Sequence, residues 1–78
     1  MLLDQTTLIR NVRELAGIGD TDVDTLLFSS GALDSVGMLA LIAFVEEQAG
    51  IEIHAEDVTL DNFDSVGRIL RFAGERAG

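Results

Sequence analysis

The residue pair with the clearest chemical potential is Asp34-Ser35, which stands directly before a long apolar run. Such a pair commonly caps a helix, because both side-chain oxygens can accept hydrogen bonds from free backbone N–H groups. No capping box accompanies it, since Met38 stands where Glu or Gln would complete one. Two interpretations of Ser35 follow: a helix cap, or a hydroxyl that a separate enzyme modifies.

Ser35 is a poor candidate for a catalytic nucleophile. It lacks the flanking glycines that place a serine on a sharp strand-to-helix turn. A triad would also need the single histidine, His54, to be oriented by an acid and aimed at the serine. That histidine follows an extended Ile-Glu-Ile run, where exposure is the usual case. We therefore expect no catalytic residue, and a small hydrolase is the weakest function considered.

The acidic residues do not make a metal site or a catalytic acid pair. Glu46-Glu47 and Glu56-Asp57 are neighbours in sequence, so the members of each pair do not share a helical face. The alternation of Asp20, Asp22 and Asp24 resembles part of a calcium loop, but the required glycine and distal glutamate are missing. The chain has no Cys and one His, which excludes thiolate and multi-histidine centres. We expect no metal.

The elements that position Ser35 show the helical period. Apolar spacing predicts a first helix over residues 4–16, which Gly17 ends. A last helix carries apolar residues at i, i+3, i+4 and i+7 from Val66, and Asn62 or Asp64 should cap it. Its outer face holds three cations: Arg68, Arg71 and Arg76. Each of these helices needs a partner for its apolar stripe.

A second helix is expected from Ser35 to about Ala49, where Gly50 ends it. Its apolar residues are not confined to one stripe, and a helix that is apolar all round should be buried all round. A domain of 78 residues with few helices cannot provide that burial. We therefore expect an exposed apolar patch next to Ser35, and such a patch usually marks a contact site.

The remaining segments connect the helices. Residues 17–34 form a long loop, with room for one helical turn at 24–27, and these side chains pin the loop to the core: Val23, Leu26, Leu27, Phe28 and Leu33. Residues 51–53 make an extended connection, and 56–60 form a short helix or turn. The sequence thus predicts a single all-α domain over 1–78. It is a small four-helix bundle of three main helices and one short helix, with a long first loop.

The core should combine helical spacing with bulky side chains. We expect it to contain Leu8, Val12, Leu15, Phe28, Leu33, Leu41, Ile42, Val45, Phe63, Ile69 and Leu70. Truncating one buried Leu or Ile costs about 2–5 kcal/mol. That cost is a large share of the stability of a small domain.

Charge separates the chain into two zones. It has 5 Lys+Arg against 14 Asp+Glu, for a formal charge of −9, and no cation lies between Glu14 and Gly67. Nucleic-acid binding needs a basic patch, and an anionic membrane surface would repel this chain. The longest apolar stretch, 36–45, is too short for a membrane span, and the N-terminus lacks the basic region of a signal peptide. We expect a cytoplasmic monomer whose acidic middle attracts basic partners.

The residues around Ser35 resemble the attachment motif of acyl and peptidyl carrier proteins. These residues carry the resemblance: Leu27-Phe28, Gly31 and Leu33-Asp34-Ser35-Val36, then Glu46-Glu47, Gly50-Ile51-Glu52-Ile53, Glu56-Asp57 and Asn62-Phe63. The resemblance covers nearly the whole chain. It implies that a separate, magnesium-dependent phosphopantetheinyl transferase esterifies Ser35 with 4'-phosphopantetheine from coenzyme A. The terminal thiol then holds an acyl or aminoacyl group as a thioester.

The chain is most similar to discrete, stand-alone carriers of natural-product biosynthesis. Fatty-acid carriers usually show acidic residues along the second helix, where this sequence has Gly37, Ala40 and Ala43. The resemblance implies loading by an adenylating ligase or acyltransferase. It also implies transfer to a downstream synthase or transferase of a polyketide or nonribosomal-peptide pathway. The alternative from the residues themselves is an unmodified acidic interaction domain, in which Ser35 is only a cap.

Partner recognition is expected on one stripe of the second helix. Apolar residues recur at i, i+3, i+4 and i+7 along this stripe, beginning beside Ser35. Glu46 and Glu47 lie at the far end of the stripe and can meet a basic rim. We expect the transferase and the partner enzymes to contact Asp34, Val36, Leu39, Ala40, Ala43, Glu46 and Glu47.

Overall fold

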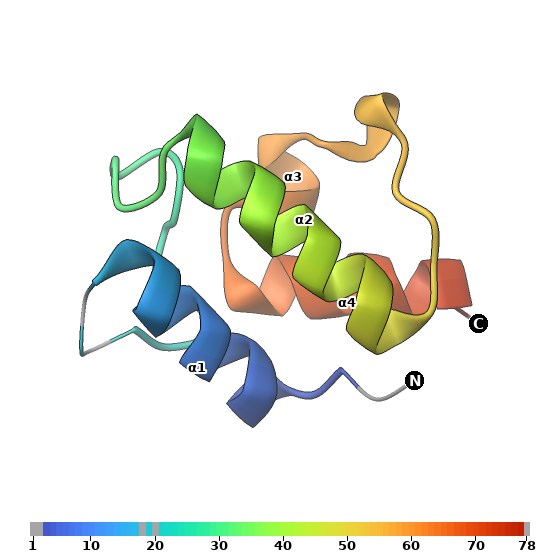
Figure 1. Ribbon diagram of the computed structural model, residues 1–78, viewed down its shortest axis with the longest axis horizontal. Coiled ribbons are helices and arrows are strands. Elements are labelled where there is room, and N and C mark those ends of the chain that lie inside the picture. Colours follow the sequence, from blue (N-terminus) through green and yellow to red (C-terminus); the bar gives the residue numbers. More distant parts are fainter. Residues whose placement is uncertain (1–2, 18, 20, 78) are drawn as a thin grey trace.

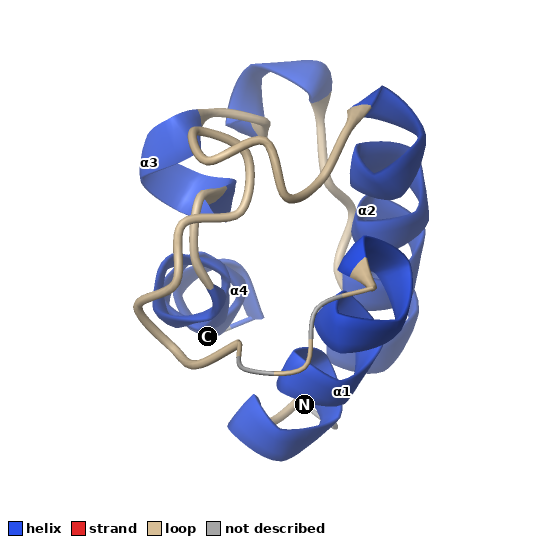
Figure 2. Ribbon diagram, turned by 90° about the vertical axis from the view of Figure 1, so that its left-hand side faces the viewer, coloured by secondary structure: helices blue, strands red, loops and turns tan. Residues whose placement is uncertain are grey.

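The computed structural model describes residues 3–17, 19 and 21–77, and every regular element among them is helical. The elements are α1 (Gln5–Ala16), α2 (Ser35–Ala49), the 3₁₀ turn η1 (Ala55–Asp57), α3 (Leu60–Phe63) and α4 (Val66–Ala77). Helices α1 and α2 form one layer, and α3 and α4 form the other (Figure 1, Figure 2). The expected bundle of three main helices and a short one is confirmed. None of the described helices has the length and apolar character needed to cross a membrane.

The ends of α1 and α2 follow from local sequence. Asp4 caps α1, and its Oδ1 accepts a hydrogen bond from the Thr7 N–H at 2.8 Å. Both helices stop where a glycine takes the left-handed conformation, with φ of 71° at Gly17 and 66° at Gly50. The predicted bounds of these two helices are confirmed, and residues 51–53 form the expected extended connection.

The cap of α4 differs from the prediction. We expected Asn62 or Asp64, but the Oγ of Ser65 accepts from the Arg68 N–H at 3.2 Å. The Asn62 side chain instead donates to the Asp57 carbonyl at 2.8 Å, and the Asp64 carboxylate binds the first loop. Both side chains have tertiary partners that the spacing of residues along the chain does not reveal.

The connecting segments also differ in detail. The helical turn considered at residues 24–27 does not form, because Asp22 makes a local turn instead. Its Oδ1 accepts from the Asp24 N–H at 2.9 Å and from the Thr25 hydroxyl at 3.1 Å, which satisfies groups that a helix would use. The short helix or turn expected at 56–60 is present as the 3₁₀ turn η1, which begins one residue earlier and ends at Asp57, and a separate short helix, α3, begins at Leu60.

The core lies between the two layers. Of the expected core residues, these are buried: Leu8, Val12, Leu33, Leu41, Val45, Phe63 and Ile69. The others are half-buried and pack against the core: Leu15, Phe28, Ile42 and Leu70. Leu27, expected to pin the loop to the core, is also fully buried, and the core further contains residues outside the expected set: Leu3, Ala49, Val66, Phe72 and Ala73. Helical periodicity gives the right faces of the long helices, but it carries no information about the loop residue Leu27.

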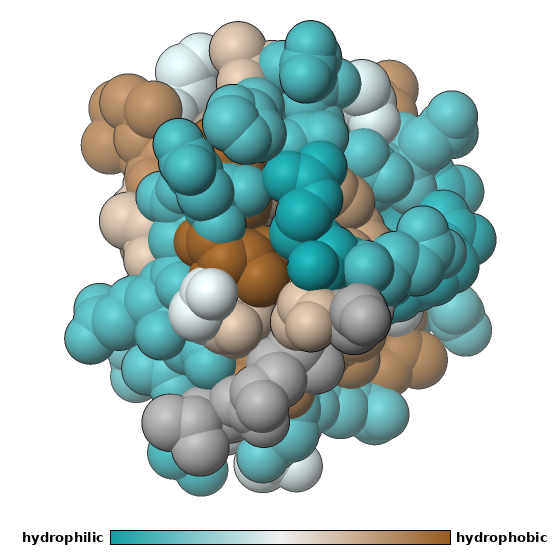
Figure 3. All heavy atoms as spheres, turned by 90° about the vertical axis from the view of Figure 1, so that its right-hand side faces the viewer, coloured by the Kyte–Doolittle hydropathy of each residue, from teal (hydrophilic) through white to brown (hydrophobic). Residues whose placement is uncertain are grey.

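The arginines of α4 bind the segment that precedes the helix. Arg76 donates to the Glu52 carbonyl at 3.0 Å and pairs with the Asp57 carboxylate at 2.7 Å. Arg68 and Arg71 donate to backbone carbonyls of α3. On the side of the molecule where α4 ends, hydrophilic side chains surround a small apolar patch (Figure 3). The cations of this helix therefore stabilise the fold of their own chain.

Candidate functional site

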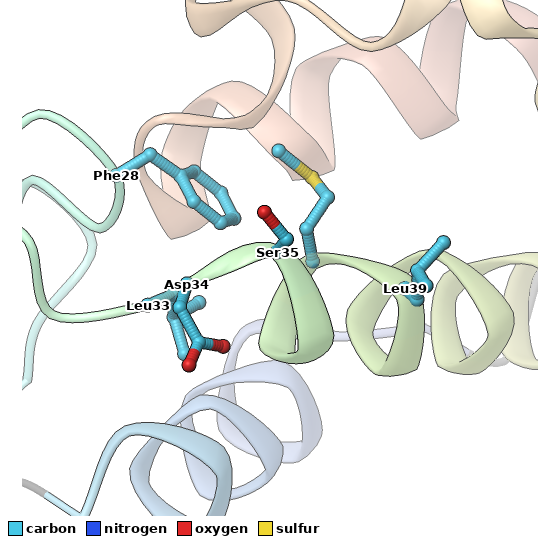
Figure 4. Close-up of a pocket in the computed structure, with 6 residues that line it drawn as sticks. Phe28, Leu33, Asp34, Ser35 and Leu39 are labelled. Atoms are coloured by element: carbon cyan, nitrogen blue, oxygen red, sulfur yellow. The ribbon is translucent and has the colours of Figure 1, made fainter.

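Ser35 is exposed at the first position of α2, beside an open cleft of about 480 Å³. The cleft is lined by Phe28, Leu33, Asp34, Ser35, Met38 and Leu39. The Ser35 hydroxyl lies on the same side of the helix start as the Phe28 ring, whereas the Asp34 carboxylate points to the other side (Figure 4). A flexible group attached to this hydroxyl would leave the helix next to an apolar wall.

The cap of α2 is Asp34 and not Ser35. The Asp34 Oδ1 accepts from the Gly37 N–H at 2.9 Å, and its carbonyl accepts from the Met38 N–H at 2.8 Å. A Cβ at position 37 would lie 3.1 Å from the Cδ2 of Leu33, so glycine avoids a tight contact with that buried side chain. Because Asp34 caps the helix, the Ser35 hydroxyl has no capping role.

A buried carboxylate fixes the loop that supplies the cleft wall. The Oδ1 of Asp64 accepts from the N–H groups of Leu27, Phe28 and Ser29 at 3.2, 2.8 and 3.0 Å, and its Oδ2 accepts from the Ser29 hydroxyl. Burial raises the pKa of Asp64, but the bonds from Ser29 and the other N–H groups outweigh burial and place the pKa below 3.8. From the sequence we expected Asp64 only as a cap of α4, and no local signal distinguishes it from the other acids of the chain.

The predicted stripe on α2 faces solvent along its whole length: Val36, Leu39, Ala40 and Ala43. Val36 and Leu39 keep 75% and 70% of their surface exposed. Leu41 and Val45, on the opposite side, are fully buried. An α-helix with apolar residues on all sides therefore has one buried face and one free apolar face, as expected.

Two further leucines extend the exposed apolar surface outside α2. Leu26 is 44% exposed and Leu60, on α3, is 52% exposed. The expectation that Leu26 pins the loop to the core is wrong, because its neighbour Leu27 takes the fully buried position instead.

The two glutamates at the end of the stripe, Glu46 and Glu47, lie in different environments. The Oε2 of Glu46 accepts from the Ile53 N–H at 2.8 Å, and this side chain is half-buried. Glu47 is exposed. Of the two glutamates that we expected to meet a basic rim, the structure thus gives Glu46 a bond within its own chain and leaves Glu47 at the surface.

The other candidate groups lie apart from the cleft. His54 is exposed and precedes η1. Its backbone N–H donates to the Asp57 carboxylate at 2.9 Å. Asp22 and Asp24 belong to the local turn, and Asp20 lies outside the described residues. Within the described part of the chain, no group of three His, Cys, Asp or Glu side chains could hold a metal ion.

Comparison with known proteins identifies the family. A family model described as a phosphopantetheine attachment site matches residues 6–73, from α1 into α4. No curated protein sequence gave a match. The chain therefore belongs to the phosphopantetheine attachment site family. It is a carrier protein that bears 4'-phosphopantetheine covalently, and it is not an enzyme. This match disfavours the alternative of an unmodified interaction domain.

Proposed function

We propose that Ser35 is the residue that carries 4'-phosphopantetheine. The observation that carries this proposal is the exposed hydroxyl at the start of α2, beside the cleft and without a capping role. The other three serine hydroxyls are engaged in the fold. Ser29 donates to Asp64, Ser30 donates to the Leu26 carbonyl, and Ser65 is buried and caps α4.

The position at the start of α2 also suits the charge of the cofactor. Esterification would give Ser35 a phosphodiester anion at the positive end of the 15-residue α2, next to the Asp34 carboxylate that caps this helix. An anion in such a position is stabilised by about 0.3–1 kcal/mol. When bound, the phosphopantetheine supplies a thiol that holds an acyl or aminoacyl group as a thioester. The protein's own part is to present the attachment point and to be bound by other enzymes.

We propose the exposed stripe of α2, Val36 to Ala43, as the surface that the phosphopantetheinyl transferase and the partner enzymes bind. Two supports are the exposed apolar side chains of Val36 and Leu39 beside Ser35 and the exposed Glu47 beyond the stripe. A basic partner would meet no competing cation along α2, because the helix contains none. A carrier that moves between enzymes needs each partner to dissociate quickly, and partner contacts limited to one exposed helix face suit this need.

The proposal for the pathway rests on the residue composition of α2. Gly37, Ala40 and Ala43 give α2 an apolar outer face, which favours a discrete carrier of polyketide or nonribosomal-peptide type over a fatty-acid carrier. Such a carrier would act as a cytoplasmic monomer of one domain. An adenylating ligase or acyltransferase would load it, and a downstream synthase or transferase would receive the cargo.

Intact-mass measurement tests the attachment site. The protein is incubated with coenzyme A, magnesium and a broad-specificity phosphopantetheinyl transferase. We expect the wild type to gain the mass of one phosphopantetheinyl group and Ser35→Ala to gain none. Ser30→Ala is the matched control, because it removes an exposed hydroxyl from the same region and should be modified fully. Modification of Ser35→Ala with an unchanged circular dichroism spectrum would contradict the proposal.

A further inference from the structure

The loop between α1 and α2 is held to the start of α4 at two places. At the first, the Gly67 N–H donates to the Val23 carbonyl at 2.9 Å. A Cβ at position 67 would lie 3.2 Å from that oxygen, so glycine permits the approach. At the second, the Asp64 side chain receives four hydrogen bonds from residues 27–29, and its carbonyl receives a fifth from Leu27 at 2.8 Å. The described residues of the loop form no helix, and these contacts join it to the second layer of the fold.

The second contact continues directly to the attachment site. The Leu27 carbonyl accepts from the Leu33 N–H at 2.8 Å, and Leu33 is buried immediately before Asp34. Phe28, whose N–H is bound by Asp64, forms one wall of the cleft beside Ser35. One carboxylate therefore fixes both the wall of the cleft and the segment that enters α2.

Asp64 has the properties that such a role requires. It is only 2% exposed, so its bonds are shielded from competing water. Hydrogen bonds to an ionised acceptor are about twice as strong as those between neutral groups. The bonded residues lie 35 to 37 positions away in sequence, so the contact joins two parts of the chain that local structure leaves separate.

We propose that Asp64 is a positioning residue for the modification of Ser35. It holds residues 27–33 in the arrangement that the phosphopantetheinyl transferase binds, although it does not itself touch the reacting hydroxyl. The proposal rests on Ser35 being the attachment site. Without the carboxylate, the loop samples other arrangements, and the apparent affinity of the transferase falls with the population of the competent one.

The test measures KM and kcat for phosphopantetheinylation of Asp64→Ala together with amide hydrogen exchange. Asp61→Ala is the control for charge, because Asp61 is an exposed acid three positions away. Val12→Ala, in the core on α1, is the control for lost stability. We expect Asp64→Ala to raise KM about tenfold with little change in kcat, and to speed exchange at residues 27–29 and 33 by tenfold or more. Asp64→Asn keeps one acceptor oxygen and should restore most of the affinity.

Two results would overturn the proposal. One is a KM for folded Asp64→Ala equal to that of Asp61→Ala. The other is an exchange increase spread evenly over all helices, as expected for Val12→Ala. If Asp64→Ala does not fold, the test uses Asp64→Asn and Ser29→Ala, which removes one donor. Both variants must then show a smaller rise in KM and a smaller local increase in exchange at residues 27–29 and 33. If the wild type gains no cofactor at Ser35, the proposed function fails, and local exchange in the variants still decides whether Asp64 holds the loop.

Discussion

Helices α2 and α4 use their outer faces in opposite ways. On α4, Arg76 pairs with Asp57 at 2.7 Å and lies 5.2 Å from the centre of the Phe72 ring, so its charge serves the fold. On α2, the outer face exposes most of the Val36 and Leu39 side chains to solvent. Contiguous exposed apolar patches often mark sites where another molecule binds. The difference is that the outer face of α4 supports the structure of its own chain, whereas that of α2 is the face we propose for partner binding.

The largest expected effect separates the two faces of α2 itself. Leu41→Ala removes a fully buried side chain and should lower the free energy of unfolding by about 2–5 kcal/mol. Leu39→Ala, on the exposed face, should change it by less than about 0.5 kcal/mol. Ile69→Ala, on the buried face of α4, should match Leu41→Ala. Urea unfolding of the three variants measures this, and equal midpoints would show that the assignment of faces is wrong.

The next effect concerns binding rather than stability. Leu39→Asp or Ala43→Arg should lower the loading rate by the cognate loading enzyme about tenfold or more, because each places a charge on the proposed docking surface. Ala55→Arg, at an exposed position on η1, is the matched control and should load normally. Loading is measured against carrier concentration, with circular dichroism to verify the fold. Unchanged loading of both stripe variants would move the docking surface elsewhere, most readily to residues 17–34.

The sequence predicted those parts of the molecule that depend on local pattern. Periodicity and two glycines gave the bounds of α1 and α2, and the Asp-Ser pair led directly to Ser35. The sequence did not predict the bonding of Asp64, because its partners lie 35 to 37 residues away and no periodicity links a loop to a helix start. The cap at Ser65 is a local bond three residues long, and the prediction missed it because it placed the helix start at Asn62 or Asp64.

Acid should weaken the contact between the loop and α4. The pKa of Asp64 is lowered in the folded protein, so the unfolded chain binds protons first as the pH falls. Asp64 therefore stabilises the fold above its unfolded pKa of 3.8, and this contribution is lost as the pH falls through the lowered pKa. We expect wild-type stability to decline from about pH 5 downward, and Asp64→Asn to show a flatter decline. Asp61→Asn should follow the wild type, and identical curves for Asp64→Asn and wild type would contradict this role.

The smallest expected effect is electrostatic. Glu47→Lys should slow association with a basic partner a few-fold at low salt, because it reverses an exposed charge beyond the stripe. The difference should shrink at high salt, since exposed charges are screened beyond about 10 Å at 0.1 M ionic strength. Glu75→Lys, which reverses an exposed charge on α4, is the control. Equal slowing by both variants would show that total charge, and not the α2 surface, sets the rate.

The most direct test of Ser35 as the attachment site is to map the cofactor on the modified wild-type protein. Trypsin cannot separate the serines, because no Lys or Arg lies between Arg13 and Arg68. A protease that cleaves before aspartate releases residues 34–56, in which Ser35 is the only serine. We predict that mass spectrometry finds the phosphopantetheinyl group on this fragment alone. Its presence on residues 24–33, which contain Ser29 and Ser30, or on 64–78, which contain Ser65, would contradict the assignment.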